Sequence, residues 1–298
     1  MSFSRRKRGP NDIVPLHCKR LNQSINQKDQ MKIKAEGKSH IGMKRKQNED
    51  CYLINPELGL YIIADGMGGH RAGEVASRMV VETIEDYWKK VHTDKPPSFL
   101  EPVDKDVSNL AKHLINSISF ANAIVHEAQK KPQYLRMGST ISALLCEGDV
   151  IWAANVGDSP VYIFDQGRLI LISEEHSVEA EQKSLGVNDF LSSTNPLMKN
   201  MLTRVMGLNG KVDVFITPLR PEPNDIIMMC SDGLTNYLSD ENIKAVLEEA
   251  SISLEKKVDI LIDEANKGGG GDNISVILLE VLEEGKWDQF KKKFILKG

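Results

Sequence analysis

Apolar strand-like stretches follow one another directly along much of this 298-residue chain, whereas its helix-like stretches come in pairs. Residues 139–158 and 160–173 each have the pattern of a β-hairpin with a glycine-containing turn. Apolar residues spaced three to five apart predict helices, at 71–91, 110–125, about 240–250 and 253–266. This order differs from the β-α-β alternation of a parallel sheet. We therefore expect an α+β fold in which antiparallel sheets carry helices on their outer faces.

The first thirty residues differ in composition from the rest of the chain. Residues 1–30 contain seven basic residues against two acidic ones and have no sustained apolar period. This composition predicts a flexible basic tail, although the stretch at residues 4–10 could also be a localisation signal or an anionic docking patch. We assign residues 31–298 to one folded domain, because no second boundary follows residue 31.

The overall charge and the cysteines limit the possible environment and partners. A net charge of −4 gives no general reason to expect nucleic acid or membrane as the partner. A nucleic acid could at most use the basic tail, because the domain lacks interleaved aromatic and basic residues. No apolar run approaches a membrane span, and no signal peptide is evident at Met1. Four separated cysteines without a C-x-x-C pair fit a cytoplasmic protein without structural zinc.

Four aspartates lie at the ends of apolar strand-like stretches: Asp65, Asp158, Asp232 and Asp272. An aspartate next to glycine is by itself most often a turn residue. If the four converge, however, charges about 4 Å apart repel by around 4 kcal/mol per pair at an effective dielectric near 20. Such a cluster requires a cation, and oxygen ligands suit Mg²⁺ or Mn²⁺. The sequence therefore indicates a divalent metal site.

Arg45 and the acidic stretch at residues 48–50 add a second element of possible chemistry. An arginine close to carboxylates is often only part of an ion pair. Beside a metal site, its guanidinium can instead bind a phosphate through two parallel hydrogen bonds. Both interpretations of Arg45 are open at this point.

Seven short motifs then occur in order: R-x-x-N-E-D at 45–50, A-D-G-M-G-G-H at 64–70, G-S-T at 138–140, G-D-S at 157–159, L-T-R-x-x-G at 202–207, S-D-G at 231–233 and G-D-N at 271–273. Each motif alone is common. Together and in this order they resemble the metal-dependent Ser/Thr protein phosphatases, the PPM or type 2C family, and in particular its bacterial branch. The resemblance covers about residues 31–283.

The resemblance implies a four-layer α/β/β/α sandwich with the metal site between two antiparallel sheets. It implies two core ions, Mn²⁺ or Mg²⁺, bridged by Asp65. The Gly66 carbonyl would bind one of them. Asp232 and Asp272 would complete the shell of one ion, and Glu49 and Asp50 would hold the other, largely through water.

The same resemblance assigns the remaining roles. Asp158 would bind a weaker third ion, and Arg45 would bind the substrate phosphate. Many eukaryotic members have a histidine, the proposed general acid, where this chain has Met67, so His70 is the candidate proton donor without being an established replacement. Residues 176–200 would form the flap beside the active site, with Pro160 and Glu175 departing from the commoner motif residues.

The function implied is that of a protein serine/threonine phosphatase, a phosphoric monoester hydrolase. A water bridging the two ions would attack phosphorus directly, with Asp65 and Arg45 as the catalytic residues and no phosphoenzyme. The expected partners are phosphoproteins, the targets of a Ser/Thr kinase in signal transduction. We expect a cytoplasmic monomer that binds neither nucleic acid nor membrane. The alternative is a catalytically weak, phosphatase-like regulatory module.

Overall fold

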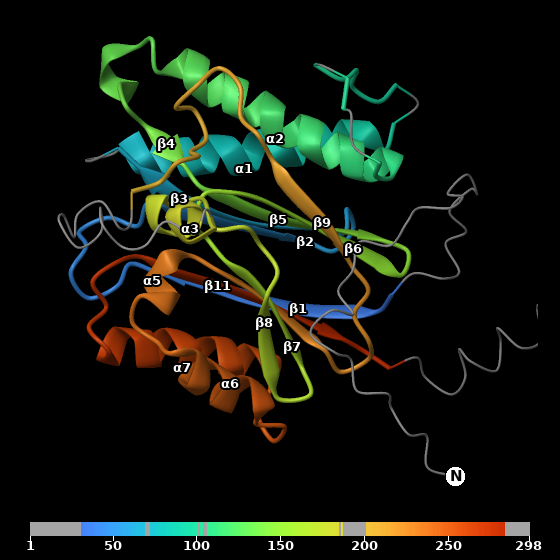
Figure 1. Ribbon diagram of the computed structural model, residues 1–298, viewed down its shortest axis with the longest axis vertical. Helices are drawn as coiled ribbons and strands as arrows, with labels where there is room; N and C mark the ends of the chain where they lie inside the picture. The colour runs from blue at the N-terminus through green and yellow to red at the C-terminus, as the bar shows by residue number, and fades with distance from the viewer. Residues whose placement is uncertain are drawn as a thin grey trace, which may run out of the picture.

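Two antiparallel β-sheets stack face to face in the computed structural model, with helices on both outer faces (Figure 1). The structure describes residues 31–68, 72–93, 95–100, 102–103, 106–184, 186 and 201–283. The predicted tail at residues 1–30 lies outside the described residues. The four layers confirm the predicted α/β/β/α sandwich.

The first sheet has five strands in the order β1-β11-β10-β7-β8. Its strands are β1 (Ile33–His40), β11 (Ile274–Val281), β10 (Ile226–Cys230), β7 (Val161–Asp165) and β8 (Arg168–Leu171). Every neighbouring pair is antiparallel. The first and last described strands therefore lie side by side.

The second sheet has six strands, with β4 paired to β3 beside the path β2-β3-β5-β6-β9. Its strands are β2 (Asp50–Asn55), β3 (Leu60–Met67), β4 (Gly138–Ser139), β5 (Ile141–Glu147), β6 (Val150–Val156) and β9 (Phe215–Leu219). These pairs are also antiparallel. The two predicted hairpins are present as β5–β6 and β7–β8.

The helices divide between the two outer faces (Figure 1). α1 (Ala72–Val91) and α2 (Asn109–Ala128) cover the six-stranded sheet. α5 (Asp232–Thr235), α6 (Asp240–Glu248) and α7 (Leu254–Lys267) cover the five-stranded sheet. Serine side chains cap the N-termini of α2, α6 and α7, as expected for residues that accept a free backbone N–H. None of the described helices is long and apolar enough to cross a membrane.

Three apolar cores hold these layers together: one between each sheet and its helices, and one between the two sheets. Alternation along β3 divides its side chains between two of them. Leu60, Ile62 and Ala64 face α1 and α2, whereas Tyr61 and Ile63 lie between the sheets. Side chains two apart on a strand share a face, so Asp65 continues the row between the sheets.

Three short elements were not predicted from the sequence. Residues 50–55 form β2, residues 178–184 form α3 (Val178–Ser184), and α5 follows β10 directly. α3 lies within the predicted flap at residues 176–200. It is polar and has no buried residue, so it lacks the apolar stripe that marks most helices. Residues 185 and 187–200 of that segment lie outside the described residues.

Candidate active site

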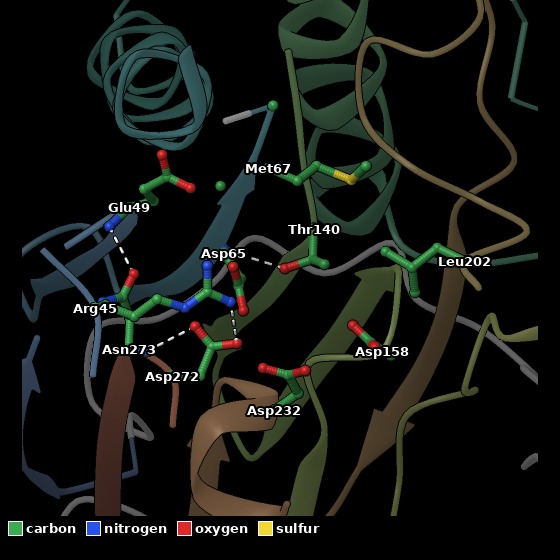
Figure 2. A pocket seen from close by; sticks show the side chains of 12 residues that line it. Arg45, Glu49, Asp65, Met67, Thr140, Asp158, Leu202, Asp232, Asp272 and Asn273 are labelled. Atoms are coloured by element: carbon green, nitrogen blue, oxygen red, sulfur yellow. Dashed lines mark hydrogen bonds and ion pairs between the residues drawn. The ribbon is translucent and has the colours of Figure 1, made fainter. Parts of the chain in front are cut away.

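A pocket of about 280 Å³ opens at one end of the sandwich, where loops from both sheets meet (Figure 2). Figure 2 shows Arg45 and Glu49 on one side, Leu202 on the other, and the aspartates Asp65, Asp272, Asp232 and Asp158 between them. The lining residues are Arg45, Glu49, Asp65, Gly66, Met67, Gly68, Thr140, Asp158, Leu202, Asp232, Asp272 and Asn273. The structure thus brings together every predicted ligand in the described ranges except Asp50.

Asp65 lies near the end of β3, on the face between the sheets. Its backbone is held by Thr140: the Asp65 N–H donates to the Thr140 hydroxyl over 3.0 Å, and the Thr140 N–H donates to the Asp65 carbonyl over 2.8 Å. The Thr140 hydroxyl also pairs with that of Ser159 at 2.7 Å. This network fixes the strand end that carries the central carboxylate, a role that the sequence did not assign to Thr140.

Asp232 and Asp272 come from the other sheet. Asp232 is the first residue of α5 and lies two residues after the end of β10, and Asp272 lies two residues before β11. Asn236 donates to Asp232 Oδ2 over 3.0 Å. Asp232 Oδ1 is buried and has no hydrogen-bond partner in the part of the chain that the structure describes. A buried carboxylate oxygen without a partner is costly, so Oδ1 is available for a ligand.

Glu49 and the Gly66 carbonyl approach each other over the start of α1. A Cβ on Gly73 would lie only 2.6 Å from Glu49 Oε2 and 2.8 Å from the Gly66 oxygen. Only glycine therefore leaves room for both oxygens at this point. Two oxygen donors of the kind that hard cations prefer are held close together here.

Asp50 lies behind the pocket rather than in its lining. Its Oδ2 accepts hydrogen bonds from the hydroxyls of Ser231, at 2.9 Å, and Ser275, at 2.6 Å. Ser275 belongs to β11 of the five-stranded sheet, and Ser231 follows the end of β10 in the same sheet. Its Oδ1 is buried and unpaired among the described residues. Asp50 thus joins the two sheets beneath Asp65, its partner in the β2–β3 register.

Arg45 pairs with a carboxylate of the pocket. Its Nη2 donates to Asp272 Oδ2 over 2.7 Å, and half of its side chain remains exposed. Of the two interpretations that the sequence left open for Arg45, the structure contains the ion pair. Arg45 lines the pocket, and its guanidinium has further N–H donors beside the one that Asp272 accepts.

The carboxylates destabilise one another's charged forms. Burial raises the pKa of Asp65 well above its usual value, and the charges of Asp50 and Asp232 raise it further. Burial, with a contribution from Asp232, raises the pKa of Asp158 to about 7. The pKa of Asp232 is raised by burial and by the charge of Asp272. A cation in the pocket would relieve all of these interactions.

Within the described ranges, no three His, Cys, Asp or Glu side chains are already gathered tightly enough to hold an ion. The donor set nevertheless suits Mg²⁺ or Mn²⁺: it consists of oxygens only, includes a backbone carbonyl, and leaves buried oxygens unpaired.

The loop that carries Asp158 is tied to the start of the predicted flap by His176. The backbone N–H of Gly157 donates to His176 Nδ1 over 3.0 Å, and the backbone N–H of His176 donates to the Gly157 carbonyl over 3.1 Å. The ring is fully buried, and Nε2 lies 3.3 Å from Glu174 and 3.0 Å from an Arg204 nitrogen. Burial and the charge of Arg204 lower the pKa of His176, so this link uses a neutral ring.

Asn273 lines the pocket and was not predicted as a site residue, although it lies in the G-D-N motif. Its Oδ1 accepts the Glu49 N–H over 2.8 Å, and its Nδ2 donates to the carbonyls of Ile41 and Gln47, each at 2.9 Å. One side chain therefore fastens the loop bearing Arg45 and Glu49 to the other sheet. His70 lies outside the described residues.

The model of the family described as protein phosphatase 2C matches residues 36–262. The chain is 34% identical over 252 residues to the serine/threonine phosphatase stp of Listeria welshimeri, covering 83% of this chain and 95% of that protein. The S. agalactiae serine/threonine phosphatase structure superposes with a TM-score of 0.74 at 33% identity, covering 84% of this chain and all of that one. The catalytic domain of the phosphatase PstP, solved in complex with two manganese ions, superposes with a TM-score of 0.69 at 26% identity, covering 84% and 99%.

A site built from carboxylates of both sheets, on this fold and with these relatives, defines a class of enzyme: the protein phosphatases. The chain belongs to the protein phosphatase 2C family. The predicted activity, that of a protein serine/threonine phosphatase, is confirmed by this membership.

Proposed function

We propose that the pocket binds divalent cations and hydrolyses phosphoserine and phosphothreonine in proteins. The observation that carries the proposal is the group of carboxylates with raised pKa values, whose charges no described side chain other than Arg45 balances inside the pocket. Bound ions would supply a nucleophilic water and stabilise negative charge on the phosphoryl group. The two manganese ions of the PstP structure support this reading.

The proposed ligands for the two core ions come from both sheets. Asp65, placed centrally, would contact both ions, and the Gly66 carbonyl would contact one of them. Asp232 and Asp272 would hold one ion from the five-stranded sheet. Glu49 would reach the other from the loop before β2, and Asp50 would support it through its unpaired Oδ1. Asp158, at the far side of the pocket, would hold a weaker third ion. Mn²⁺ and Mg²⁺ both suit these oxygens.

Arg45 would bind the phosphate. Its guanidinium reaches Asp272 in the metal-free structure, so a cation on Asp272 would compete with it for the same oxygen. The guanidinium would then be free to donate two hydrogen bonds to phosphate oxygens. In this role Arg45 orients the substrate and balances its charge.

The leaving group of the reaction requires a proton donor. Met67 lines the pocket and is 44% exposed, but its thioether has no proton to donate. His70 stays a prediction. We also propose that a Ser/Thr kinase opposes this enzyme and that the protein is a cytoplasmic monomer.

Hydrolysis of p-nitrophenyl phosphate and of a phosphothreonine peptide by the purified full chain tests the proposal. We expect no turnover after exhaustive dialysis against EDTA and recovery with Mn²⁺ or Mg²⁺. Undiminished turnover in EDTA would contradict the metal mechanism. Failure to turn over with either metal, despite metal binding by calorimetry, would favour the regulatory module instead.

A further inference from the structure

Arg136 has a backbone conformation that arginine rarely adopts. Its φ is +64°, in the left-handed region that glycine and asparagine tolerate best. The residue turns the chain from the 3-10 helix η2 (Pro132–Tyr134) into β4. Residues in such sparsely populated conformations cluster at functional sites.

Arg136 lies beside the mouth of the pocket. In the β3–β4 register, Ser139 pairs with Gly66 and Gly138 pairs with Met67, so the chain runs outward along the pocket lining. A Cβ on Gly68, which lines the pocket, would lie 3.2 Å from the Arg136 carbonyl. Thr140 at the pocket floor follows Arg136 by four residue steps, roughly 13 Å at 3.3 Å per residue for an extended chain.

The charge of Arg136 has no partner within the described ranges. Its side chain is exposed and makes no hydrogen bond or ion pair there. Every other described arginine has a carboxylate partner, and these are Arg45, Arg78, Arg168, Arg204 and Arg220. Arg136 is therefore a strained, exposed and unpaired cation next to an acidic pocket.

We propose that Arg136 binds an anionic group of the phosphoprotein substrate, located a few residues from the phosphorylated residue. A guanidinium suits carboxylate and phosphoryl groups equally, since both accept two parallel hydrogen bonds. It also offsets the repulsion between an anionic substrate and the carboxylates of the pocket. This inference rests on the proposed function.

The test uses phosphothreonine peptides that differ at one flanking position only. That position holds alanine, aspartate or a residue with a non-hydrolysable phosphonate side chain, and it is placed N-terminal to the phosphothreonine in one series and C-terminal to it in another. For each enzyme we take the ratio of kcat/KM for the anionic peptide to kcat/KM for the alanine peptide, with Mn²⁺ present. One exposed ion pair predicts a wild-type ratio of about two to five. Comparison of the aspartate and phosphonate peptides shows whether Arg136 prefers a carboxylate or a second phosphoryl group.

Arg136→Asn and Arg136→Gly both suit the left-handed backbone and remove the charge, so we expect the ratio to fall to about one in each. Arg136→Lys should keep part of the preference. Lys90→Gln is the matched control: Lys90 is exposed in α1, 17 residues beyond Gly73, or about 25 Å at 1.5 Å per residue. It should keep the wild-type ratio.

Equal ratios in wild type and in both neutral variants would overturn the proposal, as would an equal loss in Lys90→Gln. A failure of the proposed function would be recognised differently: the wild-type enzyme would release phosphate from none of the peptides, and no ratio would exist.

Discussion

Arg45 donates a hydrogen bond to Asp272 over 2.7 Å. The residue proposed to bind the substrate phosphate is therefore paired with a residue proposed to bind a metal ion. Arg45→Ala should therefore leave Mn²⁺ binding intact or tighter, because the ion no longer competes with the guanidinium. We expect KM for a phosphopeptide to rise by about ten- to a hundredfold from the lost charged hydrogen bonds, with kcat much less changed. Steady-state kinetics and calorimetry with Mn²⁺ measure the two effects. A parallel loss of metal affinity would make Arg45 a structural residue.

Asp232→Asn keeps the shape of a carboxylate and removes one charge. It should weaken Mn²⁺ binding and severely reduce turnover, yet leave the metal-free protein equally stable or about 1–3 kcal/mol more stable. Thermal unfolding in EDTA and in Mn²⁺ tests both statements. At an ion concentration 100 times its Kd, the wild type should gain about 2.7 kcal/mol. An equal gain by the variant would show that Asp232 binds no ion.

The stability of the metal-free protein should fall as pH rises from about 4 to 7. In this fold the pKa values of Asp50 and Asp158 are raised to about 7, against about 3.9 in an unfolded chain. The folded state therefore holds protons that the unfolded state has lost, and each such group reduces stability by up to about 1.4 kcal/mol per pH unit in this window.

Buried histidines act in the opposite direction, because the pKa values of His113 and His176 are lowered. Comparison with Asp158→Asn cancels their contribution, since both proteins contain them. Urea unfolding in EDTA at pH 5, 6, 7 and 8 should show a flatter decline for the variant. Identical pH profiles would mean that Asp158 is already ionised throughout this range.

Asp158→Ala should separate a third ion from the two core ions. Asp158 lies across the pocket from Glu49, on the loop tied to His176 (Figure 2). We expect turnover to fall while tight binding of two Mn²⁺ ions survives in calorimetry. Loss of all metal binding would place Asp158 among the core ligands.

Asn273→Ala should loosen the loop that carries Arg45 and Glu49. The change removes hydrogen bonds to Glu49, Ile41 and Gln47, and we expect a loss of about 1–3 kcal/mol in unfolding free energy together with weaker Mn²⁺ binding. Asn242→Ala, at an exposed position of α6, is the control and should change neither. Unchanged metal affinity in Asn273→Ala would show that the loop holds its position without this anchor.

Antiparallel sheets with outer helices and the strand-end aspartates were predictable because they depend on local patterns, whereas the four-layer sandwich followed from the family resemblance. The buried run of β3 ends on Asp65, and hairpin turns mark β5–β6 and β7–β8. β2 was missed because its residues are only partly buried beyond Asp50, so its apolar pattern is weak.

The supporting contacts could not be predicted, because they join residues far apart in the sequence. Asp50 accepts hydrogen bonds from Ser231, 181 residues away, and from Ser275, 225 residues away. Asn273 contacts a loop 224 to 232 residues earlier. A spacing pattern within a motif carries no information on such contacts, and only the stacking of the two sheets creates them.

The pairing of β1 with β11 also determines when the fold can be completed during protein synthesis. The first described strand, β1, cannot form its pairing until β11 has been synthesised, since all eight of its residues pair with residues 274–281. Asp272 emerges from the ribosome just before β11. A nascent chain therefore cannot complete its sandwich or its carboxylate cluster until nearly the whole described domain has been translated. We expect an unfinished copy to have no phosphatase activity.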